Sequence, residues 1–236
     1  MSGHSKWSTI KRQKGVTDAK RGAMFTKVAR EVAVAARTGG GDPDANYRLR
    51  LAMEKARALN MPAENIKRAI DKATHGADTE QYEEITYEGY GPHGVGIIVE
   101  CQSDNRNRTV SEIRNVFKTN GGNLGDTGAV AWMFERVALL EAKKAGVGDP
   151  EEDAIEVGAN EVVKEEEGLY AFYASPSDLD SVSKALQARG FEIVKAELSF
   201  KTKEKTKITE EQKKEIYELL EALEDNDDSH RVHASL

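Results

Sequence analysis

The hydrophobic periodicity of this chain changes once, between residues 76 and 85, and this change limits the folds that the sequence can adopt. Before it, apolar residues such as Phe25, Val28 and Val32 recur at the three- and four-residue spacing of one helix face. After it, from Ile85 on, short runs rich in β-branched and aromatic residues predict strands separated by turns. We therefore expect a helical N-terminal part followed by α/β domains.

Three amphipathic helices are predicted within residues 1–76. Gly39-Gly40-Gly41 ends the first helix, and Asn60-Met61-Pro62 separates the second from the third. Gly76 ends the third helix, and the three helices together predict a small bundle. Residues 1–16 lack the periodicity and are rich in Lys, Ser and Gly, so we expect a flexible arm that becomes ordered on a partner.

A second domain is predicted from two separated parts of the chain, residues 77–135 and 205–236. Ile85–Tyr90 and Val95–Cys101 predict a hairpin, a capping box at Thr109 predicts the start of a helix, and Ala129–Phe134 predicts a third strand. A helix after the capping box at Thr209 and a short strand within residues 231–236 would complete this sheet.

Residues 136–204 predict a third domain, inserted into the second. They show a βαββαβ order, with helices that begin after Asp149 and Ser175, which is typical of a ferredoxin-like fold. The predicted fold class is α+β: an N-terminal three-helix bundle followed by two ferredoxin-like α/β domains, the third inserted into the second.

The charge of the chain is divided unevenly between its parts. Residues 1–76 carry sixteen Lys and Arg against seven Asp and Glu, a net charge of +9, and the remaining residues carry eighteen against thirty-four, a net charge of −16. A basic module on an acidic body favours binding to a polyanion, above all nucleic acid. No apolar run is long enough to cross a membrane, and the single Cys101 excludes an intramolecular disulfide, so we expect a cytoplasmic protein.

Basic residues of this module are the candidate nucleic-acid contacts. On a helical wheel, cations within residues 18–37 lie opposite the apolar stripe, and Arg68 and Lys72 lie opposite the stripe of the third helix. The candidates are Lys6, Trp7, Lys11, Arg12 and Lys14 in the arm, and Lys20, Arg21, Lys27, Arg30 and Arg37 in the first helix.

Two alternatives remain for these residues. The cations of one helix taken alone are more simply explained as a solvated face, and Trp7 either stacks on a base or packs against the bundle. If about six of the cations meet phosphates, log K should fall against log salt with a slope of about −5 on duplex DNA or about −4 on single strands.

Arg106 and Arg108 form a second candidate site, beside the predicted start of a helix. Helix N-termini attract anions, so a phosphate is one interpretation. Pairing of both guanidinium groups with neighbouring carboxylates is the other, and the sequence does not decide between them.

Several motifs together resemble the YebC/PmpR family over essentially the whole chain. They are Gly3–Trp7, Asp18–Gly22, Gly39–Pro43, Asn60-Met61-Pro62, Asn65-Ile66, Tyr87–Pro92, Asp104–Thr109 and Ala131–Phe134. His93 and Ser229–His233 depart from the family pattern. The resemblance implies three domains around a cleft and a role in transcriptional regulation through DNA binding. It also implies a link to translation, on ribosomes stalled at proline-rich stretches.

We therefore expect a nucleic-acid-binding regulator of gene expression without enzymatic activity, cofactor or metal. The first hypothesis is a DNA-binding regulator of transcription, and the alternative is a ribosome-associated translation factor that binds ribosomal RNA. The sequence contains no HExxH, CxxC, Walker A or G-x-S-x-G motif. The expected partners are DNA or ribosomal RNA and the ribosome, with no membrane, and the protein itself is expected as a monomer or weak dimer.

Overall fold

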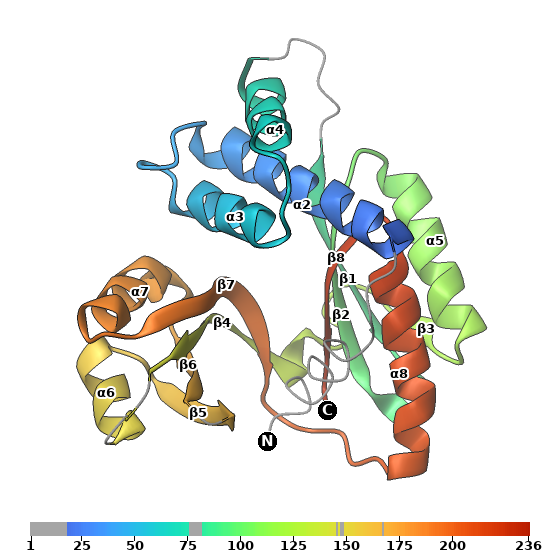
Figure 1. The fold of residues 1–236 in the computed structure, drawn as a ribbon. Helices are drawn as coiled ribbons and strands as arrows, with labels where there is room; N and C mark the ends of the chain where they lie inside the picture. The colour runs from blue at the N-terminus through green and yellow to red at the C-terminus, as the bar shows by residue number, and fades with distance from the viewer. Residues whose placement is uncertain (1–17, 76–81, 145, 147–148, 167) are drawn as a thin grey trace. The chain divides into compact units, whose positions relative to one another are not determined.

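The computed structural model describes residues 18–75, 82–144, 146, 149–166 and 168–236 (Figure 1). Its helices are α2 (Asp18–Gly39), α3 (Tyr47–Ala58), α4 (Ala63–His75), α5 (Arg106–Thr119), α6 (Pro150–Val157), α7 (Leu179–Ala188) and α8 (Glu210–Asp225). Its strands are β1 (Glu83–Tyr90), β2 (Gly96–Ser103), β3 (Asn123–Leu124), β4 (Phe134–Lys143), β5 (Glu161–Glu166), β6 (Leu169–Ala174), β7 (Glu192–Thr202) and β8 (Ser229–Ala234). The predicted α+β class is confirmed, and the predicted arm lies outside the described residues.

The described chain divides into two compact units, residues 18–132 with 205–236 and residues 133–204. The second unit is thus an insertion in the first, with its start three residues before the predicted boundary at 136. No helix in the described ranges is long and apolar enough to cross a membrane.

Helices α2, α3 and α4 pack around a shared apolar core. Val32, Ala35 and Leu49 are fully buried in it. The buried amide of Asn46 joins two of the helices, because its oxygen accepts from the Leu49 N–H at 3.0 Å while its nitrogen donates to the carbonyls of Ala35 and Gly40. A Cβ on Gly39 would lie 2.7 Å from that nitrogen, so only glycine fits where the helix ends.

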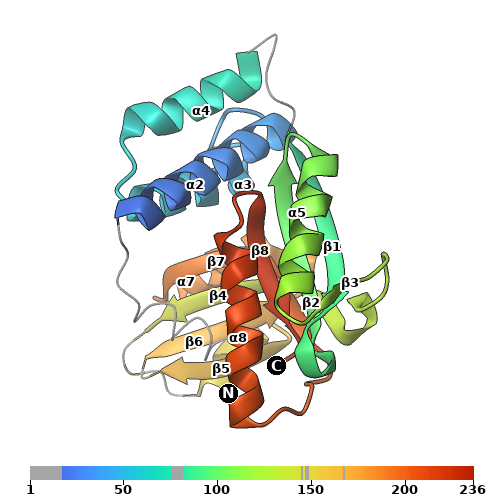
Figure 2. The ribbon, with the colours of Figure 1, turned by 90° about the vertical axis from the view of Figure 1, so that its right-hand side faces the viewer.

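A four-stranded antiparallel sheet of order β3-β1-β2-β8 forms the rest of this unit. The predicted hairpin is confirmed, with Ile85 opposite Cys101 and Tyr90 opposite Gly96. The C-terminal strand pairs with β2, so the two ends of this domain meet in one sheet. Helices α5 and α8 lie side by side on one face of the sheet, and their apolar residues, such as Phe117 and Leu219, complete its core (Figure 2).

The predicted strand Ala129–Phe134 of this sheet is wrong. Residues Ala131–Met133 form a short 3-10 helix, the third strand is β3, and Phe134 begins β4 of the other unit. The cause is the buried carboxylate of Glu88, which accepts from the backbone N–H groups of Gly128, Val130 and Ala131 at 2.8 Å each. Those donors are therefore not available to a neighbouring strand. The strand order also differs from the ferredoxin order expected for this domain.

The unit of residues 133–204 has the βαββαβ order and the strand order β5-β6-β4-β7, all antiparallel, which is the ferredoxin-like arrangement. Asp149 caps α6 as predicted, with its carboxylate accepting from the Glu151 N–H at 2.9 Å. Ser175 instead precedes a 3-10 turn that leads into α7. Phe172 and Phe191 meet edge to face in the core, with their ring centroids 5.4 Å apart.

Candidate nucleic-acid interface

The residues predicted to contact nucleic acid have different surroundings in the structure. Lys6, Trp7, Lys11, Arg12 and Lys14 lie outside the described residues. Lys20 and Arg21 lie near the start of α2. Lys27 and Arg30 contact the sheet domain, which is the sheet β3-β1-β2-β8 with its helices α5 and α8. Arg37 is exposed near the C-terminal end of α2. Arg106 and Arg108 both lie in the first turn of α5.

Lys27 and Arg30 bind α2 to the sheet domain through backbone carbonyls. The Lys27 ammonium donates to the Glu224 carbonyl at 2.5 Å. One guanidinium nitrogen of Arg30 donates to the carbonyl of Gln102 at 2.6 Å and to the carbonyl of Asp227 at 3.0 Å. Both side chains therefore stabilise the packing of α2, and their assignment to nucleic acid stays a prediction.

The carboxylate of Asp228 is the centre of this contact. Its side chain is only 3% exposed and accepts from Arg30 at 3.1 Å, from Arg108 at 3.0 Å and from Thr109 at 2.6 Å. Burial would raise the pKa of Asp228, but these hydrogen bonds and one from Ser103 hold it below the ordinary value. The ionised Asp228 thus joins α2, α5 and the loop before β8.

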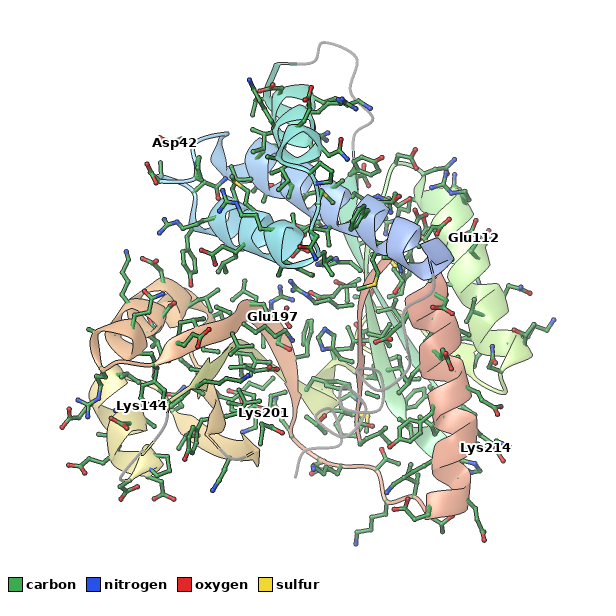
Figure 3. The ribbon with its side chains drawn as sticks, in the orientation of Figure 1. Asp42, Glu112, Lys144, Glu197, Lys201 and Lys214 are labelled. Atoms are coloured by element: carbon green, nitrogen blue, oxygen red, sulfur yellow. The ribbon has the colours of Figure 1, made fainter. Side chains whose placement is uncertain are left out.

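Arg108 pairs with carboxylates, and its assignment to nucleic acid stays a prediction. Its guanidinium contacts Asp228, donates to Asp104 at 2.7 Å and lies 3.9 Å from Glu112 of α5. Figure 3 labels Glu112 on this helix. The predicted helix start at Thr109 is wrong, because α5 begins at Arg106 and is capped by Asn105, while the Thr109 hydroxyl is buried against Asp228.

Arg106 is exposed in the same first turn of α5, where the Asn105 amide accepts from the Arg108 N–H at 3.1 Å. The Arg106 carbonyl accepts from the Tyr87 hydroxyl at 3.4 Å, which ties this turn to β1. Its assignment to nucleic acid stays a prediction.

A second ionic contact lies one residue further along α2. Glu31 is buried, and its carboxylate lies 2.8 Å from Lys55 of α3 and 3.4–3.5 Å from Arg231 and His230 of β8. Burial would raise the pKa of Glu31, yet the hydrogen bond from His230 and the positive charges of Lys55 and Arg231 hold it well below its ordinary value. Burial in turn lowers the pKa of His230.

A groove of about 420 Å³ lies between α2 and α4. Four cations line it, Arg30 and Arg37 from α2 and Arg68 and Lys72 from α4. All but Arg30 are exposed. The floor between them is apolar, with half-buried alanines from both helices. The groove thus combines a positively charged rim with a floor that water solvates poorly, which suits an anion attached to a flat apolar group.

Arg30 links this groove to the contact with the sheet domain. Its guanidinium lies over the ring of Tyr82, 4.8 Å from the centroid, and Tyr82 also lines the groove. The Arg30 Nε–H is shielded from water and pairs with no acceptor among the described residues. A shielded donor without an acceptor carries a desolvation cost.

Sequence reasoning identified the faces of α2 and α4 but not the groove between them. Arg68 and Lys72 were placed on the polar face of their helix, and their four-residue spacing was the signal. Asn65 and Tyr82 also line the groove. Asn65 belongs to a motif of the family resemblance, whereas no local pattern marks Tyr82.

Comparison with known proteins finds two family models that together cover most of the chain. Residues 5–76 match the family model described as the TACO1/YebC protein N-terminal domain, and residues 82–236 match the TACO1/YebC second and third domain. The chain belongs to the TACO1/YebC family.

Two relatives of similar length are both described as probable transcriptional regulatory proteins. A probable transcriptional regulatory protein of Bdellovibrio bacteriovorus is 52% identical over 92% of this chain and 93% of its own. One of Desulfotalea psychrophila is 50% identical over 100% of this chain and 95% of its own. The crystal structure of a conserved hypothetical protein from Aquifex aeolicus, 44% identical, has a TM-score of 0.85 and covers 94% of this chain and 93% of that one. The fold is therefore shared with the Aquifex aeolicus protein.

Proposed function

We propose that this TACO1/YebC family protein is a regulator of transcription that binds DNA, without enzymatic activity, and that the groove between α2 and α4 is its contact surface. The observation that carries the proposal is the set of four cations around this groove, in a chain whose overall charge is −7. A local positive site on a negative protein directs a polyanion to one place. The printed names of the relatives support a role in transcriptional regulation.

The contacts proposed here are mainly to phosphates. Arg37, Arg68 and Lys72 are exposed residues of the groove, whereas Arg30 is held by its hydrogen bonds to the sheet domain. Arg and Lys contacts to phosphate supply affinity and position but little information about sequence. We therefore expect weak sequence preference.

Ribosomal RNA is the second candidate ligand, and one observation favours it. Lys27 and Arg30 belong to the α2 face that would meet a duplex groove, and both are engaged by the sheet domain. A folded RNA supplies shape and exposed nucleotides to a recessed site, so it does not require a protruding recognition helix. Sedimentation of the protein with ribosomal particles at moderate salt, lost in a groove variant, would support this candidate over DNA.

The groove is tested by charge reversal with a matched control. Arg68→Glu with Lys72→Glu reverses two exposed cations, four residues apart, on α4. Arg114→Glu with Lys118→Glu makes the same change at the same spacing on exposed positions of α5. Fluorescence anisotropy on a labelled 20-base-pair duplex should show at least a tenfold loss of affinity for the first variant and a much smaller change for the second. Equal losses would refute a localised site.

A further inference from the structure

We propose that the groove between α2 and α4 takes one unpaired nucleotide, with its base on the apolar floor and its phosphate at the cationic rim. This deepens the proposed function and rests on it. The groove encloses about 420 Å³, which lies within the usual range of sites for small ligands. A site that met only the phosphates of a duplex would need the rim cations but not a hollow between them.

The apolar residues of the groove are the evidence that it binds a base. Ala29 and Ala33 of α2 face Ala69 and Ala73 of α4 across the groove, and Phe25 lies at the same surface. All five are half-buried, so part of their apolar surface stays in contact with water. A nucleobase offers a flat face that covers such a surface, and base contacts of this kind tolerate any sequence. Bases inside a duplex are stacked and do not reach a recessed floor.

The polar groups around the floor match the rest of a nucleotide. Arg37, Arg68 and Lys72 supply positive charge for its phosphate. Arg30 lines the same groove and adds a fourth positive charge. Asn65 adds a side-chain amide, which both donates and accepts hydrogen bonds. Charge and shape therefore point to one ligand class.

Ala33 allows the floor to be altered without a change of charge. It lines the groove but is not among the residues that pack into the core of the three helices. Ala33→Phe should therefore fill the groove and leave the bundle intact. Ala58→Phe makes the same substitution at an exposed position of α3 outside the groove. Thermal unfolding of both variants shows whether each one is folded.

The experiment measures the affinity of the full-length protein for a labelled 12-nucleotide single strand and for the duplex of the same sequence, each as DNA and as RNA. The inference predicts that the single strand binds roughly tenfold tighter than the duplex at equal salt. It also predicts that Ala33→Phe reduces single-strand binding to the duplex level, while Ala58→Phe retains the preference.

The failures of the two proposals are distinguishable. Equal affinity for both strand forms, with Ala33→Phe binding like the wild type, would overturn the nucleotide site but leave the groove as a phosphate contact if Arg68→Glu with Lys72→Glu still weakens binding. No binding of any probe by the folded wild-type protein would overturn the proposed function and this inference together.

Discussion

Asp228→Ala should destabilise the packing of α2 on the sheet domain more than any change to a neighbouring acidic residue. The carboxylate is nearly inaccessible, and it accepts hydrogen bonds from Arg30, Arg108, Thr109 and Ser103. Its removal leaves the Arg30 guanidinium, whose side chain is 12% exposed, without its counter-charge. Breaking a buried ion pair on one side costs about 3–5 kcal/mol, because the remaining charge stays desolvated.

The loss is measured by urea and thermal denaturation followed by circular dichroism. At about 2–4 °C for each kcal/mol in a chain of this size, the midpoint should fall by roughly 6–20 °C. Asp227→Ala is the matched control, because Asp227 is exposed and contacts Arg30 only through its backbone carbonyl. Its effect should stay within about 0.5 kcal/mol. Equal losses for the two variants, or a loss below about 1 kcal/mol for Asp228→Ala, would refute this account of the contact.

Three further predictions concern stability and reactivity. The pKa of Glu31 is held well below its ordinary value, so the ionised carboxylate adds to the free energy of unfolding at neutral pH. This contribution is lost as the pH falls below about 4.5. Glu31→Gln should therefore make the free energy of unfolding fall less steeply on the acid side of a stability–pH curve. Gly89→Ala places a Cβ 2.7 Å from the Asn123 carbonyl oxygen and should lower the free energy of unfolding by about 1–3 kcal/mol in urea titrations; an unchanged midpoint would contradict the close approach. Burial raises the pKa of Cys101 to about 12, so the thiol should resist iodoacetamide at pH 8 in the folded protein and react after unfolding; rapid native-state labelling would contradict this.

Elements that depend on local signals could be predicted from the sequence. The capping box at Thr209 is present with both of its hydrogen bonds, to and from Gln212, because the groups involved are three residues apart. The C-terminal strand was also predicted, although it begins at Ser229, two residues earlier than expected. Turns with glycine or proline also marked helix boundaries, because such a turn depends on residues that are adjacent in the sequence.

Long-range contacts explain what sequence reasoning missed. The strand predicted at Ala129–Phe134 depended on local pattern, while Glu88, about forty residues earlier, takes the N–H groups of this segment. The candidate cations Lys27 and Arg30 fit a solvent-facing basic helix by periodicity, but each has an acceptor near residue 226, at the other end of the chain, and Arg30 has another at Gln102. A helical wheel shows which residues share a face and not what covers that face.

The salt dependence of affinity tests most directly the claim that the groove cations meet phosphates. Each phosphate contact contributes about −0.9 to the slope of log K against log salt on duplex DNA and about −0.7 on a single strand. For Arg68→Glu with Lys72→Glu, the account predicts a slope shallower than that of the wild type by at least about 1.8 on a duplex or 1.4 on a single strand. Arg114→Glu with Lys118→Glu should keep the wild-type slope. Parallel lines for the groove variant and the wild type would contradict the account.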